Sequence, residues 1–179
     1  MTAINRKIVR IAIMEAATNA ATLADSDYIT GEIKSYSKSG GDLDVESDPH
    51  FGGDVDKEKA RSQFELTFEI TPSIDDTTKW EAYSYGSATV GSDTIYLSSI
   101  AATDKAVFIE AAGTSNDISW GFDNCNVTLL DMEHNADDNQ TKTLSLKFGS
   151  ENSNGRANFM AAALLVESMP AWTALPNGS

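Results

Sequence analysis

Apolar and polar residues alternate without a break from position 63 to position 70, and this pattern constrains the fold more than any other feature of the chain. Phe64, Leu66, Phe68 and Ile70 occupy every second position, with Gln63, Glu65, Thr67 and Glu69 between them. Successive side chains of a strand point to opposite faces of a sheet, whereas a helix would scatter these residues around its axis. The segment therefore predicts a strand with one buried face, which requires a second layer to pack against.

Weaker patterns of the same kind predict further strands. They lie at residues 28–36, 93–100, 106–110, 118–122, 126–132 and 141–148. Residues 7–14 fit a strand or a short helix, and residues 157–167 fit a terminal helix or a last strand. Ser, Asp and Thr residues from position 73 onward and Gly86 mark the start and the end of a predicted short helix around Trp80. The expected fold is mainly β, a β-sandwich or barrel of two packed sheets with one short flanking α-helix, a long early loop and terminal arms.

The chain of 179 residues is expected to form a single domain. Its expected parts are an N-terminal arm or strand (1–27), a core (28–150) and a C-terminal segment (151–179). The single cysteine, Cys125, excludes an intrachain disulfide, and we expect it to be a buried structural thiol.

The net charge of −14 disfavours binding to nucleic-acid phosphate and to anionic lipid. Arg10 and Glu15 interrupt the first apolar run too early for a signal peptide, and no window approaches a membrane-spanning length. We therefore expect a protein that is made and kept in a cytoplasm, without a membrane partner.

No catalytic constellation is recognisable. The two histidines, His50 and His134, lie in acidic segments, and no serine sits in a Gly-x-Ser-x-Gly motif. One cysteine and two distant histidines cannot build a zinc site, and neither familiar phosphate-binding loop occurs. We expect no enzyme activity, no catalytic residue and no cofactor.

Residues 37–59 are expected to form a long loop that is rich in acids and glycines and poor in apolar residues. Its alternating acids from Asp42 to Asp48 resemble the start of an EF-hand. Ser47 and Gly53 then stand where that loop needs glycine and glutamate, so no metal residue is assigned; irregular calcium coordination stays open.

The order of these features resembles the major tail protein of siphophages, the tail tube family. The features are the run 31–36, the acidic loop, the strand 62–71, the helix with Trp80, a β-meander with Trp120 and a closing hairpin at 126–148. The resemblance covers roughly residues 28–150.

The resemblance implies a β-sandwich whose copies form rings of six that stack into a tube. The tube would conduct DNA without binding it specifically, in the tail of a virion assembled in the host cytoplasm, with other phage tail proteins as partners. The long loop would reach a neighbouring subunit or ring. The residues assigned to this intersubunit role are Asp42, Leu43, Asp44, Val45, Glu46, Asp48, Phe51, Asp54, Asp56, Lys57, Lys59 and Arg61.

A conduit for DNA benefits from a lumen that repels phosphate. Glu65 and Glu69, on the polar side of the alternating strand, are the candidates to face that lumen. Rings of like charge repel one another, so we predict that the loop acids find lysine or arginine partners on adjacent subunits. In sequence the nearest bases are Lys57, Lys59 and Arg61.

Three alternatives stay open. The first is another virion part, such as a head-decoration or head–tail connector protein. The second is a secreted calcium-binding or carbohydrate-binding β-sandwich, and the third is an acidic DNA-mimic inhibitor.

Overall fold

The fold was obtained as a computed structural model, which describes residues 7–29, 31–40, 43–49, 55–61, 64–72, 79–112, 117–133, 141–148 and 159–175. The described elements are β1 (Lys7–Glu15), η1 (Ala20–Thr22), η2 (Asp25–Asp27), β2 (Gly31–Ser39), β3 (Leu43–Pro49), β4 (Val55–Arg61), β5 (Phe64–Pro72), α1 (Lys79–Ser84), β6 (Tyr85–Val90), β7 (Asp93–Ala101), β8 (Lys105–Ala112), β9 (Ile118–Glu133), β10 (Thr141–Phe148), β11 (Phe159–Ala162), η4 (Val166–Ser168) and η5 (Trp172–Ala174), where η denotes a 3₁₀ helix.

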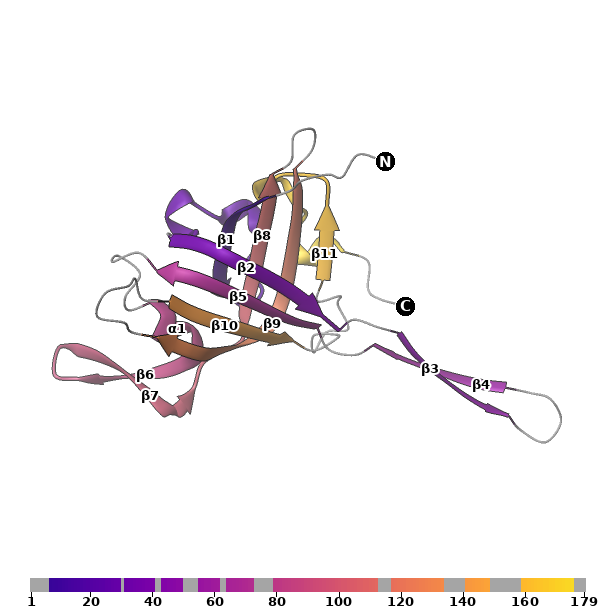
Figure 1. Cartoon of the computed structure of the whole chain (residues 1–179), viewed down its shortest axis with the longest axis horizontal. Coiled ribbons are helices and arrows are strands. Elements are labelled where there is room, and N and C mark those ends of the chain that lie inside the picture. Colours follow the sequence, from indigo (N-terminus) through magenta and orange to yellow (C-terminus); the bar gives the residue numbers. More distant parts are fainter. Residues whose placement is uncertain are drawn as a thin grey trace.

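Seven strands form one antiparallel sheet. Their order is β1-β8-β9-β10-β5-β2, and β11 pairs with β9. The sheet folds over on itself, so that β2, β5 and β10 run across β8 and the first part of β9 (Figure 1). The hairpins β3–β4 and β6–β7 form separate two-stranded sheets that extend from this body at different ends (Figure 1). The prediction of a mainly β, two-layered fold with one short flanking helix is confirmed.

Strand β9 belongs to both layers, because it bends in its middle. Its first half pairs with β8 and β11, and its second half pairs with β10. At the bend, Cys125 lies opposite Lys105 of β8 and Phe148 of β10. The register with β8 shifts there, and Asn124 has a φ of +56°, a left-handed conformation that asparagine tolerates better than most residues. A bulge of this kind turns a strand out of its sheet.

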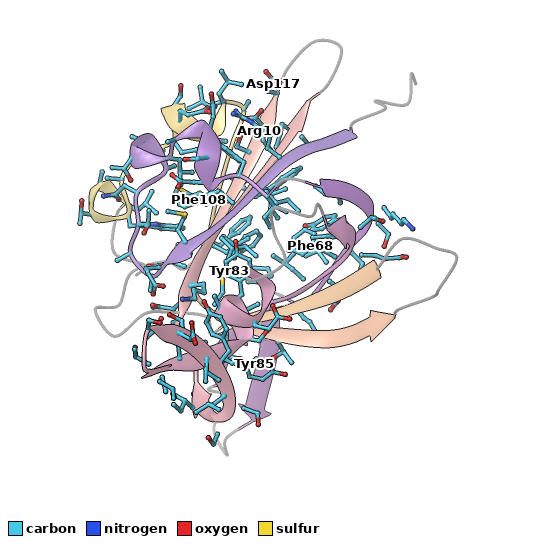
Figure 2. All side chains as sticks on the ribbon, turned by 90° about the vertical axis from the view of Figure 1, so that its left-hand side faces the viewer. Arg10, Phe68, Tyr83, Tyr85, Phe108 and Asp117 are labelled. Carbon is cyan, nitrogen blue, oxygen red and sulfur yellow. The ribbon has the colours of Figure 1, made fainter. Side chains whose placement is uncertain are left out.

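The main core lies between the two layers. Its buried members come from β1, β5, β8 and β9, and they are Ile11, Ile13, Leu66, Phe68, Ile70, Val107, Ile109, Phe122, Cys125 and Val127. Tyr83 of α1 packs against this cluster, and Figure 2 shows Phe68 and Tyr83 within the space that the two layers enclose. The apolar side of the alternating strand is therefore buried as the sequence predicts, and Cys125 is a buried free thiol.

A second core covers the opposite face of β1 and β8. Its members are Ala12, Ala20, Tyr28, Ala106, Phe108, Met160, Val166, Met169 and Trp172. The residues after β1 and those after β11 fold over this face as short 3₁₀ turns (Figure 2). Both faces of β1 and β8 are thus buried, which explains why their sequences are largely apolar instead of alternating, apart from Arg10 and Glu110 in their interiors.

Arg10 connects these two covering segments to the sheet. Its guanidinium donates to the Glu110 carboxylate at 2.8 and 3.3 Å, and its Nη2 lies 2.8 Å from Glu167. The same group lies 4.2 Å from the centre of the Tyr28 ring. Glu110, almost fully buried, also accepts a hydrogen bond from the backbone N–H of Val166. The network joins β1, β8 and both covering segments at one point.

The ionisation of this network follows from its contacts. The hydrogen bond from Arg10 to Glu110 raises the pKa of the arginine above its ordinary value. The pKa of Glu167 is lowered, first by a hydrogen bond to its own backbone and then by Arg10. Burial raises the pKa of Tyr28 to about 12. At neutral pH the arginine and Glu167 therefore carry opposite charges, and the tyrosine is neutral.

Several sequence predictions need correction. Residues 118–122 and 126–132 are parts of the single strand β9, and the region before residue 93, where we predicted no strand, contains β6. Of the two alternatives for the 157–167 segment, its described part contains the strand, β11, which is followed by the start of a 3₁₀ turn. In β2 the register shifts between Ile33 and Ser35, so Ile33 and Tyr36 both pack against the main core although strict alternation would separate them.

Where the structure describes the terminal segments, the N-terminal one fits the strand alternative, and the C-terminal one is not a free arm. Residues 7–15 form a strand of the main sheet, and residues 159–175 fold onto that sheet. Trp172 is buried, and its indole Nε1 donates to the carbonyl of Thr18 at 2.8 Å. Burial of a large aromatic side chain therefore holds the C-terminal segment on its own chain.

Replacing Arg10 by alanine is expected to lower the free energy of unfolding by about 3 to 5 kcal/mol, because it leaves the Glu110 carboxylate buried without its cation. Urea denaturation of Arg10→Ala measures the loss, and Lys34→Ala, which removes an exposed cation, is the control with little expected effect. The double variant Arg10→Met/Glu110→Leu should be less destabilised than Arg10→Ala. Equal stability of Arg10→Ala and the control would contradict this role.

Candidate functional site: assembly surfaces

The outer face of β2, β5, β10 and the second half of β9 is polar. The register places three rows of residues across it. They are Ser39–Glu65–Lys147–Asn126, Ser37–Thr67–Ser145–Thr128 and Ser35–Glu69–Thr143–Asp131. Residues opposite each other in a ladder share a face, so the positions form one continuous field. Three acids and one base are in these rows.

Glu65 and Glu69 lie on β5, in the two outer rows of this field. Both are half-buried, and Glu69 accepts a hydrogen bond from the Ser35 hydroxyl at 3.4 Å. Their strand is flanked by β2, which is the last strand in the sheet order. The proposed lumen residues therefore share a polar face next to a sheet edge, although the structure of one chain leaves their position in an assembly a prediction.

The acidic segment is not the loop that we expected. Residues 43–49 and 55–61 form the hairpin β3–β4, which we call the β3–β4 arm, and it extends away from the body (Figure 1). Its register runs from Leu43 opposite Arg61 to Pro49 opposite Val55. Backbone pairing between two polar strands needs no apolar core, and sequence reasoning that looked for core residues missed it.

Most residues assigned to the intersubunit role lie on this arm. Leu43, Asp44, Val45, Glu46 and Asp48 are in β3, whereas Asp56, Lys57, Lys59 and Arg61 are in β4. Asp42, Phe51 and Asp54 lie outside the described residues. The structure therefore brings nine of the twelve residues together on one projecting hairpin, and their contact with a neighbour stays a prediction.

The β6–β7 hairpin carries an exposed apolar surface that the sequence analysis did not single out. Val90, Ile95, Leu97 and Ile100 are exposed by 60, 40, 38 and 39%. The register places Gly86 opposite Leu97, and Ala88 opposite Ile95. In the sequence, Ala88 and Val90, and likewise Ile95 and Leu97, are two residues apart, and this spacing could have indicated a strand pair with one apolar face. Surface patches of this kind mark sites of protein association.

Gly86 allows this hairpin to fold back closely. A Cβ atom at this position would lie 2.2 Å from Cγ2 of Ile100 and 2.9 Å from the backbone oxygen of Ala101. The second contact is with backbone, which cannot move aside as a flexible side chain can. Glycine is therefore required at the base of the β6–β7 hairpin, where it begins immediately after α1.

The described residues offer little for other chemistry. No group of three or more histidine, cysteine, aspartate or glutamate side chains within them is arranged to hold a metal ion. Burial, followed by the nearby carboxylates of Asp123 and Asp104, raises the pKa of the Cys125 thiol well above its usual range, so the reactive thiolate is disfavoured. No helix in the described part of the chain is long and apolar enough to cross a membrane.

No protein-family model matches the chain, and no curated protein matches it significantly. Among solved structures, the chain is similar to one from an extracellular contractile injection system, the PVC sheath–tube complex in its extended state. The two are 15% identical with a TM-score of 0.46, over 87% of this chain and 89% of that chain. It is also similar to the tube-terminating cap of the anti-feeding prophage, at 15% identity and a TM-score of 0.45, over 92% of this chain and 96% of that chain. Both TM-scores are below 0.5, so the likeness by itself assigns no function.

Replacing Val90, Ile95 and Leu97 together by threonine is expected to weaken self-association while changing the free energy of unfolding by less than about 1 kcal/mol, because threonine favours strands and these side chains are already exposed. Sedimentation velocity measures association, and thermal unfolding measures stability. Thr89→Ser/Thr94→Ser, on the other face of the same hairpin, is the control. Unchanged association of the triple variant would show that this surface has no role in it.

Proposed function

We propose that the chain is a structural, self-assembling subunit of a phage-type tail tube, in which copies form rings and the rings stack into a conduit for DNA. The observation that carries the proposal is the pair of hairpins that extend from the sandwich. Each forms a sheet of only two strands, and neither sheet pairs with another strand among the residues that the structure describes.

Hairpins of this kind are marginally stable in water unless something packs on them. The β6–β7 hairpin leaves four large apolar side chains exposed, and the β3–β4 arm extends clear of the body (Figure 1). Both features are unfavourable in a solitary protein and favourable in one that neighbouring copies complete. A subunit of a tube has neighbours within its ring and in the next ring, so two separate contact elements fit that arrangement.

The folded sheet supports the same proposal. Strand β2 ends the sheet order, so its outer edge is a template on which a further strand can pair. Copies joined through their sheets in a closed ring would remove such free edges, as a barrel does. The polar field around Glu65 and Glu69 then becomes the candidate lumen wall.

Electrostatics favour this face for a DNA conduit. Glu65, Glu69 and Asp131 outnumber Lys147 in the three rows, and the whole chain carries a net charge of −14. A wall of this sign repels phosphate, so the polymer slides past without being held. The two similar solved structures are themselves parts of a sheath–tube complex and a tube cap, but the proposal does not depend on that likeness.

Negative-stain electron microscopy of the concentrated protein is expected to show open-ended tubes of uniform diameter. Such tubes would separate this function from the alternatives by shape. Isolated trimers or closed rings that never stack would favour a head-decoration or connector protein. A compact monomer at every concentration would contradict self-assembly and would leave the inhibitor and the secreted sandwich as the remaining candidates.

The variant Glu65→Lys/Glu69→Lys is expected to form tubes that retain DNA at low salt, whereas wild-type tubes do not, because cations on the lumen wall bind phosphate. Co-sedimentation of tubes with linear DNA measures retention. Asp104→Lys makes the same change of charge at an exposed position outside this face and is the control for the single variants Glu65→Lys and Glu69→Lys. If the lysine variant does not assemble, Glu65→Gln/Glu69→Gln replaces it. Equal DNA retention by lumen and control variants would contradict the placement of this face.

A further inference from the structure

The β3–β4 arm separates its charges by face. Leu43 pairs with Arg61, Val45 with Lys59, Ser47 with Lys57 and Pro49 with Val55, which places three bases and several apolar residues at positions that share one face. Asp44 pairs with Ala60, Glu46 with Glu58 and Asp48 with Asp56, which places five acids at positions that share the other face. We call these the basic face and the acidic face. The separation follows directly from the period of two in a strand.

The acidic face is electrostatically unfavourable in a single copy. Glu46 lies opposite Glu58 and Asp48 lies opposite Asp56, and like charges directly opposite in a ladder destabilise it. No lysine or arginine occupies any position of that face. The arm therefore gains stability from positive charge that something outside it supplies.

The basic face of the arm is a concentrated source of that charge within the chain itself. The chain has 13 lysines and arginines, and three of them, Lys57, Lys59 and Arg61, fall on this one face. Two bases of the body already have carboxylate partners: Arg10 contacts Glu110 and Glu167, and Lys105 contacts Glu15. The basic face also carries apolar residues, which exclude water from a contact and so strengthen the attraction of its charges.

We propose that the acidic face of one copy's β3–β4 arm docks on the basic face of the arm of a second copy. The inference rests on the proposed self-assembly and names the contact that drives it. Each arm offers both faces, so the contact is heterologous: one copy uses its acidic face and the next uses its basic face. A heterologous contact repeats in one direction and produces rings or open-ended assemblies.

Charge reversal of each face tests the proposal. One variant, Lys57→Glu/Lys59→Glu/Arg61→Glu, makes both faces acidic. The other, Asp44→Lys/Glu46→Lys/Asp48→Lys/Asp56→Lys/Glu58→Lys, makes both faces basic. Each variant alone is expected to raise the concentration needed for assembly by about tenfold or more, because like charges then meet at the contact. An equimolar mixture should restore assembly, with the two variants alternating.

Electron microscopy and sedimentation of the variants, alone and mixed, give the result, and circular dichroism checks that each body stays folded. Normal assembly of the acid-only variant would overturn the proposal, because the acidic face would then have another partner. Failure of the mixture, with folded components, would overturn it too. A wild type that never assembles would refute the proposed function itself, whereas wild-type tubes with unaffected variants would refute only this contact.

Discussion

The bend in β9 is the constraint on which the rest of the structure depends. A single strand of 16 residues begins in one layer and ends in the other, so the layers are continuous through its backbone. The bulge at Asn124 turns the strand, and the buried Asp123 next to it accepts a hydrogen bond from the backbone N–H of Ala17 at 2.8 Å. Without the bend, the apolar faces of β5 and β8 would not meet, and the main core would not be enclosed.

The bend also makes the two layers unequal. The layer of β1 and β8 is covered on its outer side by the terminal segments, which Arg10 holds through Glu110 and Glu167. The layer of β2, β5 and β10 has a polar outer face instead, and β2 ends the sheet order. Among the described residues, one layer is therefore covered on its outer side, whereas the polar face, the edge of β2 and the two hairpins are not. This asymmetry suits a subunit with distinct inner and outer surfaces.

Local patterns predicted the strands well where one face of a strand is buried. The alternation at residues 64–70 gave β5 and its buried side chains, and the pair at 126–148 gave the antiparallel contact of β9 with β10. The same reasoning failed for the β3–β4 arm, because it took a lack of apolar residues as evidence for a loop. A hairpin outside the core needs no apolar face of its own, so hydrophobic periodicity could not find it. In the same residues, acids recur at every second position (Asp44, Glu46 and Asp48), and this period of two is the pattern that indicates a strand.

The sequence by itself determined the strand-rich class, the buried side of β5 and the excess of acids, because these depend on residue type and on a period of two. The tertiary structure alone decided which residues meet across long separations: Arg10 with Glu110, Trp172 with Thr18, and the polar rows across four strands. Register and bulges fix those contacts, and they depend on how strands pair over the whole chain, which no local pattern contains.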